Sequence, residues 1–152
     1  MRLFWILLFG MLALPAPAQA QDLGAFDQLL RVKSVRCQFG EGTTASWDGG
    51  KLKLERGAAG EGMNSTFDSI DIKKRHARLI TRAGAGDVQV IADGNGLTFY
   101  EFLPLGGLNI TTVFHAQIKT PHQRFIAVMS KHVVLLSGPL PSQWHGTCEV
   151  LH

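Results

Sequence analysis

The sequence predicts an all-β protein: a single antiparallel β-barrel or β-sandwich of about ten short strands, preceded by a short helix. One observation is that glycine-containing turns recur along most of the chain at intervals of about 8–12 residues. Another is that the segments between those turns are rich in β-branched and aromatic residues and in places alternate between apolar and polar. The chain has 152 residues, which is enough for one domain and too short for two ordinary ones. The turn spacing fits a barrel and a sandwich equally well.

Residues 1–20 have the pattern of a cleaved secretory signal peptide. Arg2 supplies a positive start, residues 3–14 are almost wholly apolar, and Ala18-Gln19-Ala20 matches the small-x-small cleavage pattern. The apolar run has about 12 residues, whereas a membrane-spanning helix needs roughly 20. We therefore expect cleavage near Ala20, no transmembrane anchor, one mature domain over residues 21–152, and a secreted or periplasmic location.

Residues 22–32 are expected to form the short N-terminal helix. Apolar residues recur there at helical spacing: Leu23, Phe26, Leu29 and Leu30. Asp22 is available as the N-cap, because its side chain can accept a hydrogen bond from a free backbone N–H of the first turn.

The segments after the helix are predicted as strands joined by tight turns. Residues 32–39 and 43–47 are expected to be separate strands. Asp48-Gly49-Gly50 then predicts a hairpin turn, because glycine supplies the positive φ that such turns require. In the strand that follows this turn, alternation predicts that Leu52 and Leu54 point inward.

The remaining strands carry more apolar residues. They are expected at residues 66–72, 77–82, 88–92, 97–103, 109–115, 125–129 and 133–136. The first of these is predicted to contain a β-bulge near Asp68-Ser69, because its apolar residues change parity there. In residues 97–103 and 125–136, large apolar groups occupy both parities, so both faces need cover. The helix can supply that cover, and so can a second subunit that forms a homo-oligomer through the apolar C-terminal half.

The sequence contains two cysteines, Cys37 and Cys148. In an exported chain, two cysteines predict one disulfide. We expect it to join the first strand to the last, with Cα atoms roughly 5.5 Å apart, as in neighbouring strands. A thiol nucleophile or a metal ligand is the alternative, although no second cysteine lies near either one.

Glu101 has the same strand parity as Leu97 and Phe99. If that parity faces the core, a carboxylate is buried and needs a partner, which would suit a ligand-anchoring or acid–base residue inside a barrel. In the opposite assignment, Tyr100 and Phe102 face the core and Glu101 lies at the rim. Glu101 is therefore a candidate ligand-binding residue, and no residue is assigned a catalytic role.

Ser130 and His132 lie two residues apart on one strand face. A nucleophile and a base so placed suggest a hydrolase, but no GxSxG turn surrounds the serine, and such neighbours seldom meet in catalytic geometry. The histidines show no HxxxH or HExxH spacing, although His115, His132 and His145 can converge in space on a zinc or copper ion. We expect no metal and no cofactor, and we keep His132 as a candidate ligand-binding residue.

The segment Trp144-His145-Gly146-Thr147-Cys148 combines a large aromatic residue with the second cysteine. Trp144 is expected to pack near the disulfide, and Gly146 to allow a close approach of the backbone or a bulge. A ligand-binding role for Trp144, together with Gln143, is the alternative.

The charge of the mature chain is nearly balanced. Removing Arg2 leaves 14 basic and 12 acidic residues, a net charge of +2. Residues 73–82 form the one dense basic segment; we expect a solvated strand end there, with contact to an anionic surface as the alternative. No nucleic-acid partner is expected.

An exported, small, all-β chain with one disulfide resembles periplasmic binding barrels, among them bacterial lysozyme inhibitors and lipocalin-like modules. No residue of the chain matches a motif of these families, so the resemblance transfers no site. We expect a non-catalytic binding or envelope-accessory module of a bacterial periplasm, with a small molecule or a protein as its ligand. Two alternatives stay open: an envelope hydrolase or metal-dependent enzyme using Glu101, Ser130 or the histidines, and a structural, oligomer-forming β protein.

Overall fold

The computed structural model describes residues 23–60, 63–118 and 124–152. The predicted signal peptide, Asp22 and the loop around Pro121 lie outside the described residues. The described part holds one helix, α1 (Leu23–Arg31), and eleven strands. The strands are β1 (Val35–Asp48), β2 (Lys51–Ala58), β3 (Ser65–Asp71), β4 (His76–Thr81), β5 (Gly84–Asp93), β6 (Gly96–Phe102), β7 (Leu108–Ile118), β8 (Arg124–His132), β9 (Val134–Leu135), β10 (Gly138–Pro139) and β11 (Ser142–Val150).

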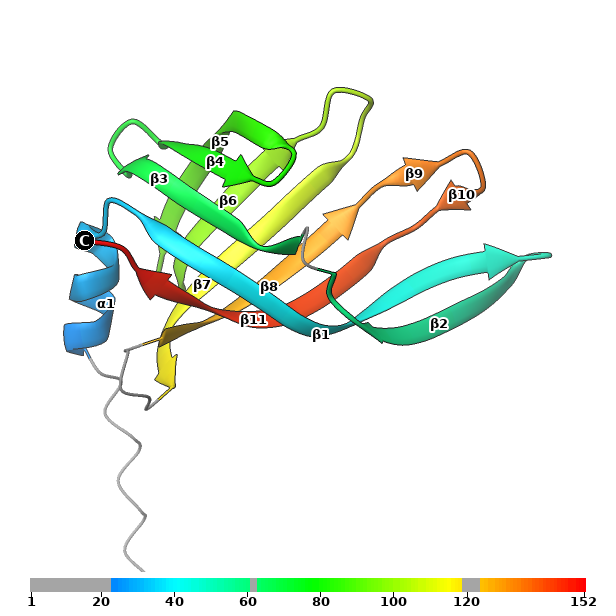
Figure 1. Ribbon diagram of the computed structural model, residues 1–152, viewed down its shortest axis with the longest axis horizontal. Helices are drawn as coiled ribbons and strands as arrows, with labels where there is room; N and C mark the ends of the chain where they lie inside the picture. The colour runs from blue at the N-terminus through cyan, green and yellow to red at the C-terminus, as the bar shows by residue number, and fades with distance from the viewer. Residues whose placement is uncertain (1–22, 61–62, 119–123) are drawn as a thin grey trace, which may run out of the picture.

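Eight of these strands close into an antiparallel barrel, which confirms the all-β class and decides between a barrel and a sandwich. The strand order is β11-β8-β7-β6-β5-β4-β3-β1, and a further pairing between β11 and β1 closes the ring. Among the described strands, β2 pairs with β1 alone, so it continues the sheet outside the ring, while β9 and β10 form a small separate hairpin (Figure 1).

Helix α1 closes one end of the barrel. Ala25 and Leu29 are buried within the same apolar cluster as the barrel interior. On one side of that end, Gln117 Nε2 in β7 donates a hydrogen bond to Gln28 Oε1. On the other side, the N–H of Ile70 in β3 donates to the Lys33 carbonyl just after the helix. The helix predicted at residues 22–32 is thus confirmed, and it covers one end of the barrel (Figure 1).

Three irregularities shape the strands. The predicted bulge in β3 is confirmed by a register shift between Asp68 and Asp71, with Ser69 at a φ of 51°. The expectation of separate strands at 32–39 and 43–47 is wrong, because β1 runs through both segments. The pairing of β1 with β11 shifts register between Phe39 and Gly42, but the strand continues through this point. A third shift lies in β7, after residue 113.

The β1–β2 hairpin extends past the barrel. Its two-residue turn is the predicted one, with Gly49 at φ 55° and Gly50 at φ 77°. The prediction that Leu52 and Leu54 point inward is wrong, because they are 55% and 70% exposed. Alternation correctly places both leucines on one face of the hairpin. That face lies beyond the ring of strands, where no described segment buries it.

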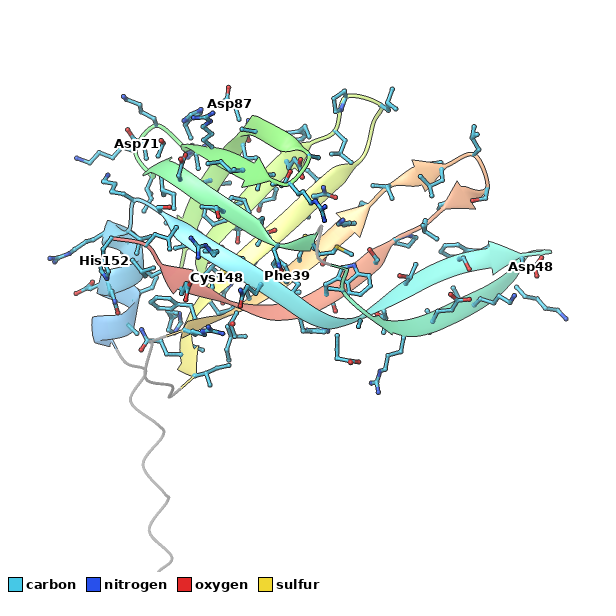
Figure 2. All side chains as sticks on the ribbon, viewed as in Figure 1. Phe39, Asp48, Asp71, Asp87, Cys148 and His152 are labelled. Atoms are coloured by element: carbon cyan, nitrogen blue, oxygen red, sulfur yellow. A yellow bond between two sulfur atoms is a disulfide. The ribbon has the colours of Figure 1, made fainter. Side chains whose placement is uncertain are left out.

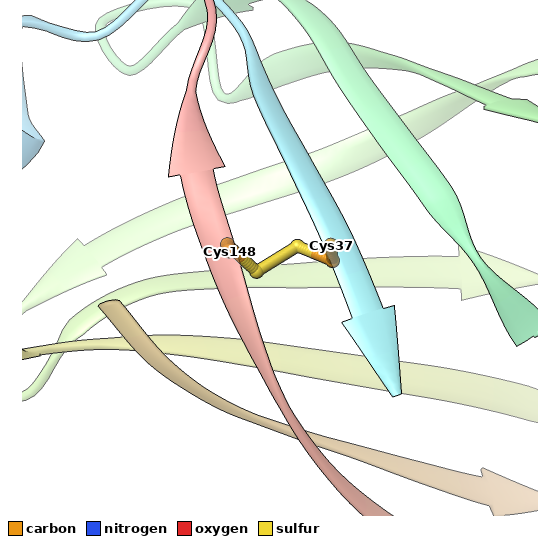
Figure 3. The surroundings of a disulfide bond; sticks show 2 residues. All are labelled: Cys37 and Cys148. Carbon is orange, nitrogen blue, oxygen red and sulfur yellow. A yellow bond between two sulfur atoms is a disulfide. The ribbon is translucent and has the colours of Figure 1, made fainter. Parts of the chain in front are cut away.

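The predicted disulfide between Cys37 and Cys148 is present and joins β1 to β11 (Figure 3). The two cysteines are direct register partners, and both are fully buried. Their Cα atoms are 4.0 Å apart, closer than the predicted 5.5 Å. The N–H of Leu151 donates to the Ser34 carbonyl, so alternation along the ladder makes Cys37 and Cys148 a non-hydrogen-bonded pair, the closer of the two kinds.

Within the described ranges, no helix combines the length and the apolarity needed to cross a membrane.

Candidate binding site at the open barrel mouth

The barrel interior is arranged in layers that become more polar with distance from α1. The layer near the helix is apolar and contains Leu97, Val113, Ala127, Gly146 and Phe39. The next layer is mixed and contains Phe99, Thr111, Met129, Trp144 and Gly42. The outermost layer is polar and contains Glu101, Asn109, Lys131, Ser142 and Thr44. Each layer is a row of register partners across β6, β7, β8, β11 and β1, so the inward parity of these strands ends in polar residues at the open mouth.

A cavity of about 140 Å³ lies at this mouth, on the side formed by β3, β4, β6, β7 and β8. Its apolar wall includes Phe67 and Phe99, whose rings stack with their centroids 3.9 Å apart and their planes 16° from parallel. Leu79 and Met129 extend that wall. The polar groups come from Ser65, Thr81, Glu101, Asn109, Thr111 and Lys131.

Glu101 and Asn109 form the central polar pair of the cavity. They are direct register partners on β6 and β7, and Asn109 Nδ2 donates a hydrogen bond of 2.6 Å to Glu101 Oε2. A carboxylate only accepts hydrogen bonds when ionised, so this bond fixes which end of the amide faces Glu101. The amide oxygen, Asn109 Oδ1, must therefore face elsewhere.

Two buried oxygens at this cavity have no hydrogen-bond partner among the described residues: Asn109 Oδ1 and Ser65 Oγ. Ser65 is only 8% exposed. A buried polar atom without a partner costs about 1–3 kcal/mol, so most such atoms in folded proteins are satisfied. Both residues line the same cavity, so the two unpartnered oxygens belong to side chains of its wall.

Lys131 brings a positive charge to the same mouth. It lies directly opposite Asn109 on the inward parity of β8, together with Met129, Ala127 and Phe125. Among the described residues, Lys131 and Glu101 do not form an ion pair with each other. One ammonium and one carboxylate thus stand on either side of β7, both available to a ligand.

Of the three predicted ligand-binding residues, Glu101 lines the mouth cavity, whereas Trp144 and His132 do not. Glu101 takes the inward parity and lines the cavity, whereas Phe102 is 66% exposed. Trp144 is buried on the inner face, one layer below the mouth, and its Nε1 donates to Ser142 Oγ at 3.0 Å. Trp144 does not line the mouth cavity. His132 lies at the exposed end of β8, at the outward parity.

Sequence reasoning missed Ser65, Asn109 and Lys131. Lys131 had a usable signal, because it shares the parity of Phe125, Ala127 and Met129. Asn109 shares its parity with Thr111 and Val113. Ser65 had no signal, since its segment was expected to begin one residue later.

The residues of the enzyme alternatives are not brought together in the described part of the chain. Ser130 Oγ accepts a 3.4 Å hydrogen bond from Gln143 Nε2, and no bond joins Ser130 to His132 there. His115 lies at the helix end, where its ring packs edge-on against Phe26 and its Nδ1 lies 2.9 Å from the Asn95 carbonyl oxygen. His132 lies at the opposite end of the barrel, and the described residues contain no group of three or more potential metal ligands. Hydrolase or metal chemistry stays a prediction that none of this geometry supports.

Comparison of the chain with models of protein families, with curated proteins and with solved structures found no match.

Proposed function

We propose that this protein is an exported, non-catalytic binding module that takes a small polar ligand, or one side chain of a larger partner, into the open mouth of its barrel. The observation that carries the proposal is that one cavity is lined by both Asn109 and Ser65, whose buried side-chain oxygens have no hydrogen-bond partner among the described residues. The buried disulfide supports export, because such bonds persist in oxidising compartments. A bacterial periplasm is the location that fits this bond and the signal-peptide pattern of residues 1–20.

The lining of the mouth defines the chemistry of the ligand. Glu101 and Asn109 Oδ1 offer acceptors, so the bound group carries hydrogen-bond donors such as an amine, an amide or hydroxyls. Lys131 offers a donor on the other side of β7, so the ligand also carries an acceptor or a negative charge. The apolar wall of Phe67, Phe99 and Met129 suits a compact apolar body between these ends. A cavity of about 140 Å³ is smaller than the roughly 300–1,000 Å³ of drug-sized sites, so it holds a small ligand or the tip of a larger one.

The experiment is a fragment screen against the purified, disulfide-bonded chain, read by ¹H–¹⁵N NMR. The library consists of small amines, amides, amino acids and polyols. We expect hits that combine a donor with an acceptor, and we expect them to shift the amide resonances of Glu101, Asn109 and Lys131.

Two mouth variants and one outer-face variant test the assignment. Asn109→Leu removes the free acceptor and should weaken binding about tenfold, the loss of one hydrogen bond of ~1.4 kcal/mol. Ser65→Ala should also weaken binding, yet raise the stability of the free protein by about 1 kcal/mol, because it removes a buried hydroxyl without a partner. His132→Ala, on the outer face, should leave binding unchanged. A screen without mouth hits, or hits that bind all three variants like the unmodified protein, would refute the proposal.

A further inference from the structure

Strand β2 has a free edge. It is the last strand of the sheet order, and the described residues place no strand beside its outer edge. Every residue from Lys51 to Arg56 is exposed. Figure 2 shows Asp48 at the far tip of the β1–β2 hairpin, well away from the ring of strands. An exposed strand edge with unpaired backbone groups is a template for pairing with another chain.

The backbone register identifies which groups that edge presents. Asp48 and Lys51 close a two-residue turn, so they form a hydrogen-bonded pair, and alternation directs the backbone groups of Lys53 and Glu55 toward β1 as well. The N–H of Ala59, at the same parity, donates to the Gly40 carbonyl of β1, as this alternation requires. The N–H and C=O groups of Leu52, Leu54 and Arg56 therefore point to the free edge.

The side chains on the two faces of β2 differ in character. Leu52 and Leu54 share a face with Trp47, because Trp47 is the register partner of Leu52. This apolar face is exposed, with Trp47 at 47%. Lys53 and Glu55 lie on the opposite face, where Lys53 also forms a 3.6 Å ion pair with Asp48.

We infer that two copies of this chain pair edge to edge through β2, antiparallel, with Leu54 opposite Leu54 of the partner subunit. In this register Lys53 faces the partner's Glu55, and the twofold symmetry repeats that ion pair. Leu52 faces the partner's Arg56, whose aliphatic stem covers the leucine. No like charges stand opposite each other, which matters because such pairs destabilise antiparallel strands.

Charge repulsion also disfavours the neighbouring register, which is centred on Lys53. Centring the pair on Lys53 would place Lys51 opposite the partner's Glu55, but it would also bring the two Lys53 ammonium groups together at the symmetry axis. The Leu54-centred register avoids that repulsion. It also makes Lys53 and the partner's Glu55 a non-hydrogen-bonded pair, in which side chains stand closer. The self-complementary charges identify a second copy of this chain as the occupant of the edge.

Sedimentation velocity of the disulfide-bonded chain, over a wide range of micromolar concentrations, measures the association. We expect a concentration-dependent dimer. Lys53→Glu and Glu55→Lys should each weaken it about tenfold or more, because each replaces two attractive cross-strand pairs by two repulsive ones. The double variant exchanges the charges and should restore the dimer. Lys51→Glu makes the same change in net charge as Lys53→Glu, but it lies opposite the partner's Gly57 and should have little effect.

A backbone variant tests the edge itself. Leu54→Pro removes an N–H that has no backbone partner among the described residues, so the barrel should fold normally while the dimer is lost. Leu54→Thr reduces the apolar surface but keeps the N–H, and should retain more of the association. A monomer at every concentration would overturn the inference. A dimer that is indifferent to Leu54→Pro, or one that the charge-exchanged double variant does not restore, would overturn this surface and register.

Discussion

Gly42 shows how a single residue holds a large side chain in the core. It lies opposite both Trp144 in β11 and Gly57 in β2. A Cβ built on Gly42 would overlap the Trp144 indole and the Gln143 carbonyl oxygen. The backbone of Gly42 does not have positive φ, so the need for glycine here comes from space and not from conformation. Trp144 packs where it does because β1 has no side chain at this position.

Gly42→Ala should therefore lower the free energy of unfolding by about 1–3 kcal/mol, the usual cost of overpacking. Urea unfolding measures this loss. Trp144 fluorescence should also shift to the red as the indole moves toward water. Gly57→Ala is the matched control, because it is the cross-strand neighbour of Gly42 and its added Cβ meets nothing within 4 Å. Equal losses in the two variants would contradict this role of Gly42.

At the residue scale, strand parity found Glu101 but not its surroundings. Alternation places Glu101 with Leu97 and Phe99, and the inward assignment of that parity is the one observed. The neighbours Asn109 and Lys131 come from β7 and β8, and they meet Glu101 through the register between strands. Register depends on turn lengths and bulges across the whole ring, so a linear pattern cannot supply it.

At the element scale, the sequence predicts turns and bulges better than it predicts which strand face is buried. The Gly49-Gly50 turn and the bulge near Asp68-Ser69 follow from local backbone requirements and are confirmed. The direction of Leu52 and Leu54 was predicted wrongly. Alternation states which residues share a face, but only the tertiary structure states whether anything covers that face.

The turn between β3 and β4 carries a pH-dependent contact. Asp71 Oδ1 accepts the N–H of Lys74 at 3.0 Å, and Asp71 Oδ2 forms a 3.6 Å ion pair with Lys74 Nζ. The hydrogen bond from the Lys74 N–H is the largest cause that holds the pKa of Asp71 below its ordinary 3.8. Desolvation opposes it, and the Lys74 side chain and the charge of Lys33 lower the pKa further.

Since the folded-state pKa of Asp71 is lowered, its contribution to stability is present above pH 3.8 and is lost as the pH falls through the lower folded-state pKa. An NMR titration of the Asp71 carboxyl should give a midpoint below 3.8. In Lys74→Ala the midpoint should rise but stay below 3.8, because the backbone N–H, the largest cause, remains. A midpoint at or above 3.8 in the unmodified protein would contradict this account.

At the scale of the whole molecule, barrel closure depends on the contact between its first and last strands. The cysteine count and the export signal predicted a bond between the ends of the domain, and closure of the ring explains why the bond is possible. Strand β1 pairs with β11 from Val35 to Thr44, with one register shift between Phe39 and Gly42, so the disulfide lies within this ladder. The sequence could not choose a barrel over a sandwich, because both use the same strand and turn pattern.

The disulfide should stabilise the barrel without being required for it. Cys37 and Cys148 close a loop with a sequence separation of 111. The chain-entropy model assigns such a loop roughly 4–5 kcal/mol, as an upper estimate, because a compact unfolded chain already restricts its ends. The β1–β11 ladder and the shared core would remain after reduction.

We therefore expect the variant Cys37→Ala/Cys148→Ala to keep its far-UV β spectrum, while its free energy of unfolding in urea falls by about 2–4 kcal/mol. Comparison with the unmodified chain unfolded under reducing conditions separates the lost cross-link from the lost sulfur atoms, since reduction removes only the bond. An unfolded double variant would show that the ladder alone cannot close the barrel, and an unchanged urea midpoint under reduction would show that the bond does not stabilise it.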